Sequence, residues 1–116
     1  MNNVTLIGMP GSGKSTIGVI LAKALRYEFL DSDLLIQKQE KRKLSEIIEQ
    51  DGPEKFKEIE NQVNADIHVT DTVIAPGGSA IYYPSVFEHF KKDGVVVYLH
   101  VPVEEIERRL SNLATR

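Results

Sequence analysis

The most constraining feature of the chain is the stretch GMPGSGKST, which runs from Gly8 to Thr16. It matches the phosphate-binding loop pattern, in which a glycine, four residues, a second glycine, a lysine and a hydroxyl residue follow one another. An apolar run from Val4 to Ile7 precedes the loop, and apolar residues at helical spacing follow it. A strand, a glycine-rich turn and a helix in this order predict that the chain binds a nucleoside triphosphate.

The residues of this loop have separate expected roles. Glycines lack a Cβ, so the backbone can point successive N–H groups inward at a phosphate. A helix beginning near Lys14 adds its positive N-terminal end. We expect the Lys14 ammonium to reach the outer phosphates of ATP and the Ser15 hydroxyl to ligate Mg²⁺. The nucleotide-binding residues predicted in the loop are Gly11, Ser12, Gly13, Lys14, Ser15 and Thr16.

Strand and helix patterns alternate along the chain, which predicts an α/β domain with a mainly parallel sheet. The expected strands are Val4–Ile7, Phe29–Asp31, Val73–Ala75 and Val95–His100. The expected helices are Lys14–Arg26, Asp33–Lys41, Leu44–Gln50, Pro53–Val69, Pro84–Lys92 and Val103–Leu113. In the first helix, Ile17, Leu21 and Leu25 mark one apolar face, with Ile20 and Ala24 on adjoining turns. The unbroken apolar run from Val95 is typical of a buried parallel strand.

Composition narrows the class of protein. The chain has 116 residues, a net charge of −3, 41% hydrophobic residues and no cysteine. We expect one domain over residues 1–116, and the lack of cysteine excludes a disulfide scaffold, a thiol nucleophile and a thiolate zinc site. The first residues lack the basic start and long apolar stretch typical of a signal peptide, and no apolar run approaches membrane-spanning length. No basic stripe indicates a nucleic-acid partner. We therefore expect a cytoplasmic protein with no membrane or nucleic-acid partner. A monomer is a separate expectation, which the composition does not determine.

A second motif, Asp31-Ser32-Asp33, directly follows the second expected strand. Ligands of doubly wound sheets lie at the carboxyl ends of the strands, which places Asp31 near the Mg²⁺ held by Ser15. Asp33 can instead face the crevice and accept the proton of an incoming hydroxyl. Either aspartate can also cap the following helix, which is a common role of this residue type.

A third motif, Ala75-Pro76-Gly77-Gly78, follows the third expected strand. Paired glycines at the end of a strand let the backbone approach a small ligand closely. A simple tight turn is the alternative interpretation, because two glycines alone are weak evidence.

With these motifs, nearly the whole chain resembles the shikimate kinase family. That family pairs a phosphate loop with an Asp-x-Asp after the second strand, a Phe-Arg-x-x-Glu on a helix and a Gly-Gly-Gly turn after the third strand. The matching segments here are GSGKST, Phe29–Asp33, Val97–Leu99 and the pair Arg108-Arg109. The resemblance implies a P-loop kinase with a three-layer α/β/α fold, which transfers the γ-phosphoryl group of ATP to a hydroxyl of shikimate.

The resemblance also implies site residues. Asp31 would serve Mg²⁺ through water, Asp33 would hold the acceptor hydroxyl and can act as base, and Gly77 and Gly78 would line the acceptor pocket. Arg109 would lie against the adenine. Arg116 stands where the family begins its lid, with an arginine that reaches the transferred phosphate. The implied catalytic set is therefore Lys14, Asp33 and Arg116.

Departures from the family pattern bear on the acceptor. Lys57 occupies the position of the family's carboxylate-binding arginine, and lysine cannot supply a planar bidentate fork. Pro76 replaces the first glycine of the triplet, and the C-terminal strand and helix of the fold are expected to be missing after Arg116. The predicted acceptor-binding residues are Asp33, Lys57, Gly77 and Gly78. The alternatives are a kinase of this fold for another hydroxyl compound, such as gluconate or a nucleotide, and a nucleotide-binding module without turnover.

Overall fold

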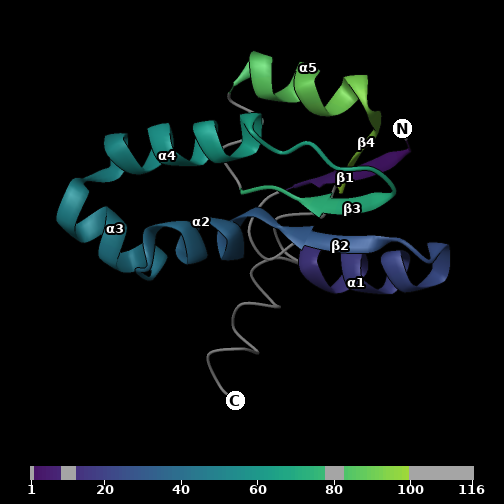
Figure 1. Ribbon diagram of the computed structural model, residues 1–116, viewed down its shortest axis with the longest axis horizontal. Coiled ribbons are helices and arrows are strands. Elements are labelled where there is room, and N and C mark those ends of the chain that lie inside the picture. The colour runs from purple at the N-terminus through teal and green to yellow at the C-terminus, as the bar shows by residue number, and fades with distance from the viewer. Residues whose placement is uncertain (1, 9–12, 78–82, 100–116) are drawn as a thin grey trace.

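The structure is a computed structural model that describes residues 2–8, 13–77 and 83–99. Strands and helices alternate from the start of the chain (Figure 1). Their bounds are β1 Asn3–Ile7, α1 Lys14–Leu25, β2 Glu28–Asp31, α2 Ser32–Glu40, α3 Leu44–Asp51, α4 Pro53–Ala65, β3 Thr72–Ala75, α5 Pro84–Lys92 and β4 Gly94–Tyr98. Within these ranges no helix is both long and apolar enough to cross a membrane. The helix expected at Val103–Leu113 lies outside the described residues.

The four strands form one parallel sheet in the order β2-β3-β1-β4. Val73 of β3 pairs with Val4 of β1 and with Phe29 of β2. Since the strands run in the same direction, their carboxyl ends meet at one edge of the sheet. The predicted parallel α/β fold is confirmed.

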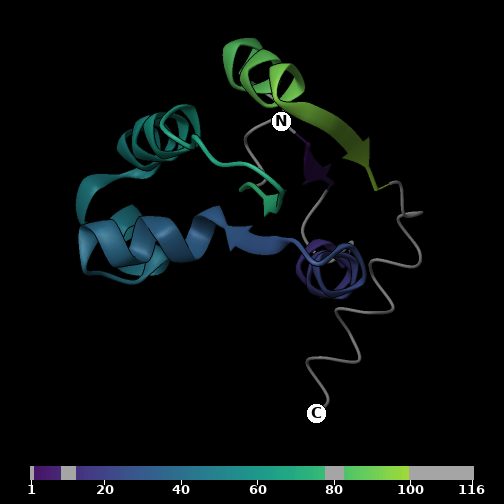
Figure 2. The ribbon, with the colours of Figure 1, turned by 45° about the vertical axis from the view of Figure 1, so that its right-hand side comes forward.

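Alternate side chains of the central strands enter two separate cores. Leu6 and Val73 pack with Ala22 of α1 on one face of the sheet. Ile74 packs with Phe90 of α5 on the other face. Figure 2 shows α1 and α5 on opposite faces, so the sheet is the middle layer of three.

The apolar face predicted for α1 is buried only in part, at Leu21, which packs against the cluster of Leu6, Ala22 and Val73. Gly18 and Ala22 are its buried residues, whereas Ile17 and Ile20 are 42% and 64% exposed. A Cβ at Gly18 would collide with the ring of Phe29. The helix therefore meets the sheet through its smallest residues, and the larger apolar ones lie beside the contact.

The prediction that β4 is a buried strand is also wrong for the part of the chain that the structure describes. Val96 packs on the α5 side, but Val95 and Tyr98 are 61% and 56% exposed. Helix α1 packs mainly against β3 and β2 and less against β1. The strand ends at Tyr98, before the predicted end at His100.

Helix α4 packs against α2 and α3 through apolar residues at helical spacing. Phe56, Ile59 and Val63 join a core cluster with residues of α2 and α3. The helix ends at Ala65, four residues before the predicted end, and the backbone N–H of Asp66 donates to carbonyls of the last turn.

Asn3 joins the start of β1 to the segment that leads into β3. Its side chain is buried, with Nδ2 donating to the carbonyl of Val69 at 2.8 Å and Oδ1 accepting from the N–H of Thr72 at 3.1 Å. One amide therefore satisfies a donor and an acceptor of the same loop.

We predict that Asn3→Ala lowers the free energy of unfolding by about 2 kcal/mol or more, because it leaves two buried backbone groups without partners. Asn2 is exposed, so Asn2→Ala is the matched control and should change little. Urea unfolding of the three proteins measures the difference. Equal stability of the two variants would contradict the bridging role.

Candidate phosphate and acceptor site

The described part of the phosphate loop ends at a helix N-terminus. Gly13 caps α1 with φ of 91°, a left-handed conformation that glycine adopts without strain. The first backbone N–H groups of a helix have no partner within the helix and carry positive partial charge. The start of α1 is therefore suited to an anion.

Lys14 lies among three carboxylates. Its Nζ donates to the carbonyl of Gly8 at 2.8 Å. Burial lowers the pKa of Lys14 below its ordinary value, and the charges of Asp33, Asp31 and Glu60 oppose that shift. The ammonium thus lies in a partly desolvated place where it balances several negative charges.

The Asp31 carboxylate contacts the first turn of α1 and the first turn of α2. Its Oδ1 accepts from the backbone N–H of Asp33 at 2.9 Å, which caps α2, and its Oδ2 lies 3.4 Å from the hydroxyl of Ser15. Capping and proximity to Ser15 were separate predictions, and the one carboxylate does both. The Ser15 and Asp31 oxygens are the hard ligands that Mg²⁺ prefers.

Asp33 is held as a less acidic carboxyl group than usual. Burial raises its pKa, repulsion from Asp31 raises it further, and attraction to Lys14 acts in the opposite direction. A carboxylate with raised basicity is suited to accepting a proton.

Gly77 lies against two of these acidic side chains. A Cβ placed on it would collide with the carboxylate of Glu60 and lie 3.1 Å from Oδ1 of Asp33. Glu60 is a buried residue of α4 and points to the carboxyl end of β3. The absence of a side chain at Gly77 is thus what allows α2, α4 and the end of β3 to meet.

Two residues of this site were not predicted from the sequence. Ser32 is fully buried, and its Oγ accepts from the N–H of Gly77 at 2.8 Å. Glu60 completes the Phe-x-x-x-Glu spacing that begins at Phe56, and that spacing was the available signal for it. For Ser32 the signal was its place between two site aspartates.

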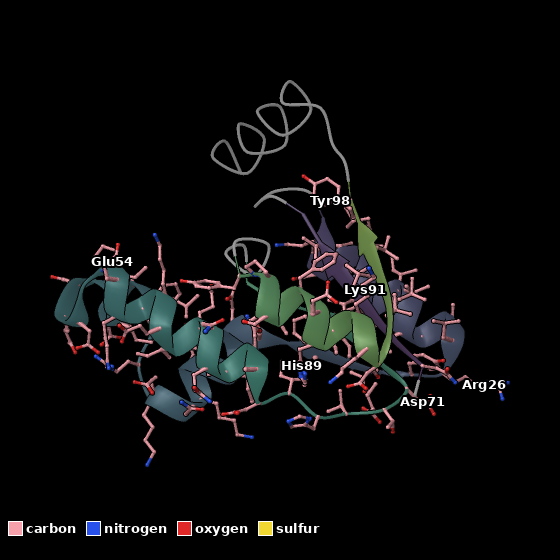
Figure 3. All side chains as sticks on the ribbon, turned by 90° about the horizontal axis from the view of Figure 1, so that it is seen from above. Arg26, Glu54, Asp71, His89, Lys91 and Tyr98 are labelled. Atoms are coloured by element: carbon pink, nitrogen blue, oxygen red, sulfur yellow. The ribbon has the colours of Figure 1, made fainter. Side chains whose placement is uncertain are left out.

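Lys57 is not directed into this group of side chains. It is half-exposed, and its Nζ lies 4.0 Å from Glu54, which is at the outer end of α4 (Figure 3). The predicted site residues outside the described part of the chain are Gly11, Ser12, Gly78, Arg109 and Arg116.

Comparison with known proteins identifies the family. A sequence model of shikimate kinases matches residues 10–116. The chain belongs to the shikimate kinase family. The shikimate kinase of Microcystis aeruginosa is 39% identical over 98% of this chain, and that of a Synechococcus strain is 43% identical over 93% of it. The chain spans 60% and 55% of the length of these two relatives.

Solved structures agree with this assignment. A shikimate kinase from Acinetobacter baumannii, in complex with shikimate, matches with a TM-score of 0.86 and 35% identity, covering 100% of this chain and 65% of its own. A gluconokinase from Sinorhizobium meliloti matches with a TM-score of 0.59 and 18% identity, covering 99% and 66%. The second likeness shows the shared fold alone.

We predict that the cost of a side chain at residue 77 depends on Glu60. Gly77→Ala should lower the free energy of unfolding by about 1–3 kcal/mol, the usual cost of overpacking. Glu60→Ala removes the carboxylate that the new methyl group meets, so the double variant should lose less than the sum of the two single variants. Urea unfolding of all four proteins gives the coupling energy. Strict additivity would show that Glu60 does not confine this turn.

Proposed function

We propose that this chain contains the phosphate-binding and acceptor-binding parts of a shikimate kinase, which transfers the γ-phosphoryl group of ATP to a hydroxyl of shikimate. The observation that supports this most directly is the meeting of Lys14, Asp31 and Asp33 at the carboxyl edge of the sheet. The remaining parts of the proposal are a cytoplasmic location and a monomeric state.

The nucleotide half of the reaction is assigned to the start of α1. Backbone N–H groups from Gly13 to Thr16 would bind phosphate oxygens, and Lys14 would exchange the Gly8 carbonyl for the outer phosphates. Ser15 and Asp31 would hold Mg²⁺, which neutralises phosphate charge when bound. The described residues contain no group of three or more acidic or histidine side chains able to hold a metal. Mg²⁺ usually takes its other ligands from substrate phosphates and water.

The acceptor half is assigned to the space bordered by Asp33 and Gly77. Asp33 would accept a hydrogen bond from the reacting hydroxyl and take its proton as the hydroxyl oxygen bonds to the γ-phosphorus. The bond from that phosphorus to the bridging oxygen would break, and ADP would leave with its electron pair. Gly78 would border the acceptor together with Gly77. Arg116 would contact the transferred phosphate, and Arg109 would contact the adenine. Phosphoryl transfer depends mostly on such positioning and on charge neutralisation.

The deciding experiment measures shikimate-dependent release of ADP by the purified chain with ATP and Mg²⁺. We expect Lys14→Ala to lower turnover by about 10²-fold or more, because a charged contact to the transferring phosphates is lost. Lys23→Ala, on the exposed side of the same helix, is the control and should retain activity. ATP binding without shikimate-dependent turnover by the parent would overturn the acceptor assignment. Unchanged ATP binding by a folded Lys14→Ala variant would overturn the nucleotide assignment.

Lys57 provides a test of the acceptor that does not depend on the phosphate loop. If it binds the shikimate carboxylate as a point charge, Lys57→Arg should lower the KM for shikimate about tenfold, the value of one further charge-assisted hydrogen bond. Lys55→Arg changes an exposed lysine of the same helix and is the control. Steady-state kinetics with shikimate compares the two. An unchanged or raised KM in Lys57→Arg would show that Lys57 does not bind a carboxylate.

A further inference from the structure

The three residues Asp31, Ser32 and Asp33 direct their side chains to three different places. Asp31 faces Ser15 of the phosphate loop, and Asp33 borders the space beside Gly77. Ser32 turns into the protein, where it is completely buried and accepts a hydrogen bond from the Gly77 N–H. The middle residue is therefore the one that joins this segment to the turn after β3.

The hydrogen bond between Ser32 and Gly77 lies just beyond the carboxyl ends of β2 and β3. The last paired residues of β2 and β3 are Asp31 and Ala75. Beyond them no further residues of the two strands are paired. Ser32 and Gly77 are the next residues to meet, although they are 45 positions apart in the sequence. Their bond extends the connection between the strands into the loops that form the site.

The position of Gly77 matters because of its acidic neighbours. Oδ1 of Asp33 would lie 3.1 Å from a Cβ on Gly77, and the Glu60 carboxylate is closer still. A buried N–H that loses its acceptor turns to another one where it can. The carboxylates of Asp33 and Glu60 lie on the side of Gly77 where a Cβ would stand, so they are the acidic groups that a displaced Gly77 would meet.

We propose that Ser32 is a positioning residue of the phosphoryl-transfer site. By accepting a hydrogen bond from the Gly77 N–H, it fixes the turn at Gly77 relative to α2. This leaves the Asp33 carboxylate available for the acceptor hydroxyl. The identity of that acceptor rests on the proposed function, but the connection between Ser32 and Gly77 does not.

The kinetic test compares Ser32→Ala with Ser45→Ala, an exposed serine of α3. We expect kcat/KM for shikimate to fall about tenfold in Ser32→Ala, while the KM for ATP changes by less than about twofold. Ser32→Thr retains the hydroxyl and should recover most of the loss. Equal losses toward ATP and shikimate, or no loss at all, would overturn the positioning role. If Ser32→Ala does not fold, Ser32→Cys fills nearly the same space with a weaker acceptor and takes its place.

A second measurement needs no turnover. Amide hydrogen exchange of Gly77, followed by NMR without ligands, should be about tenfold faster in Ser32→Ala than in the parent, and unchanged in Ser45→Ala. Equal exchange in all three proteins would overturn the proposal. Faster exchange in Ser32→Ala with a parent that does not phosphorylate shikimate would overturn the proposed function and support the connection. If the parent phosphorylates shikimate and Ser32→Ala has the same kcat/KM for shikimate as the parent, the positioning role is overturned.

Discussion

The parallel pairing of β3 with β1 on one side and β2 on the other brings the loops of the site together. It aligns Val4, Phe29 and Val73 across the sheet, so that the three carboxyl ends form one edge. The phosphate loop follows β1, the Asp31–Asp33 segment follows β2 and Gly77 follows β3. A shift of one residue in either register would turn alternate side chains to the opposite face and separate these groups.

The edge brings together more negative than positive charge. Asp31, Asp33 and Glu60 all act on Lys14, and burial still lowers the pKa of the lysine. The raised pKa of Asp33 shows that its charged form is disfavoured there. Electrostatic energy stored in this way is typical of functional sites, where groups are held ready for a ligand rather than for maximum stability. A cation bound beside Asp31 would relieve the repulsion between the two aspartates.

The strands and helices, and the segments that meet at the carboxyl edge of the sheet, could be predicted from the sequence. Hydrophobic periodicity and the loop pattern predicted every described strand and helix, because both depend on local spacing. The buried face of α1 was not predictable, since it depends on the Phe29 ring that packs onto Gly18. The contact of Ser32 with Gly77 depends on the register of β2 and β3, which local patterns do not determine.

Helix α4 shows how the departure at Lys57 is compatible with an acceptor site. Its buried side carries Glu60, whereas Lys57, three residues earlier, is half-exposed and close to Glu54. Exposed ion pairs contribute little to stability because water and salt screen them and two long side chains must be ordered. Lysine also has a flexible stem, whereas arginine depends on a fixed planar fork. Lys57 can therefore leave Glu54 at small cost. If it binds the acceptor as proposed, it would do so through its charge and not through a planar fork.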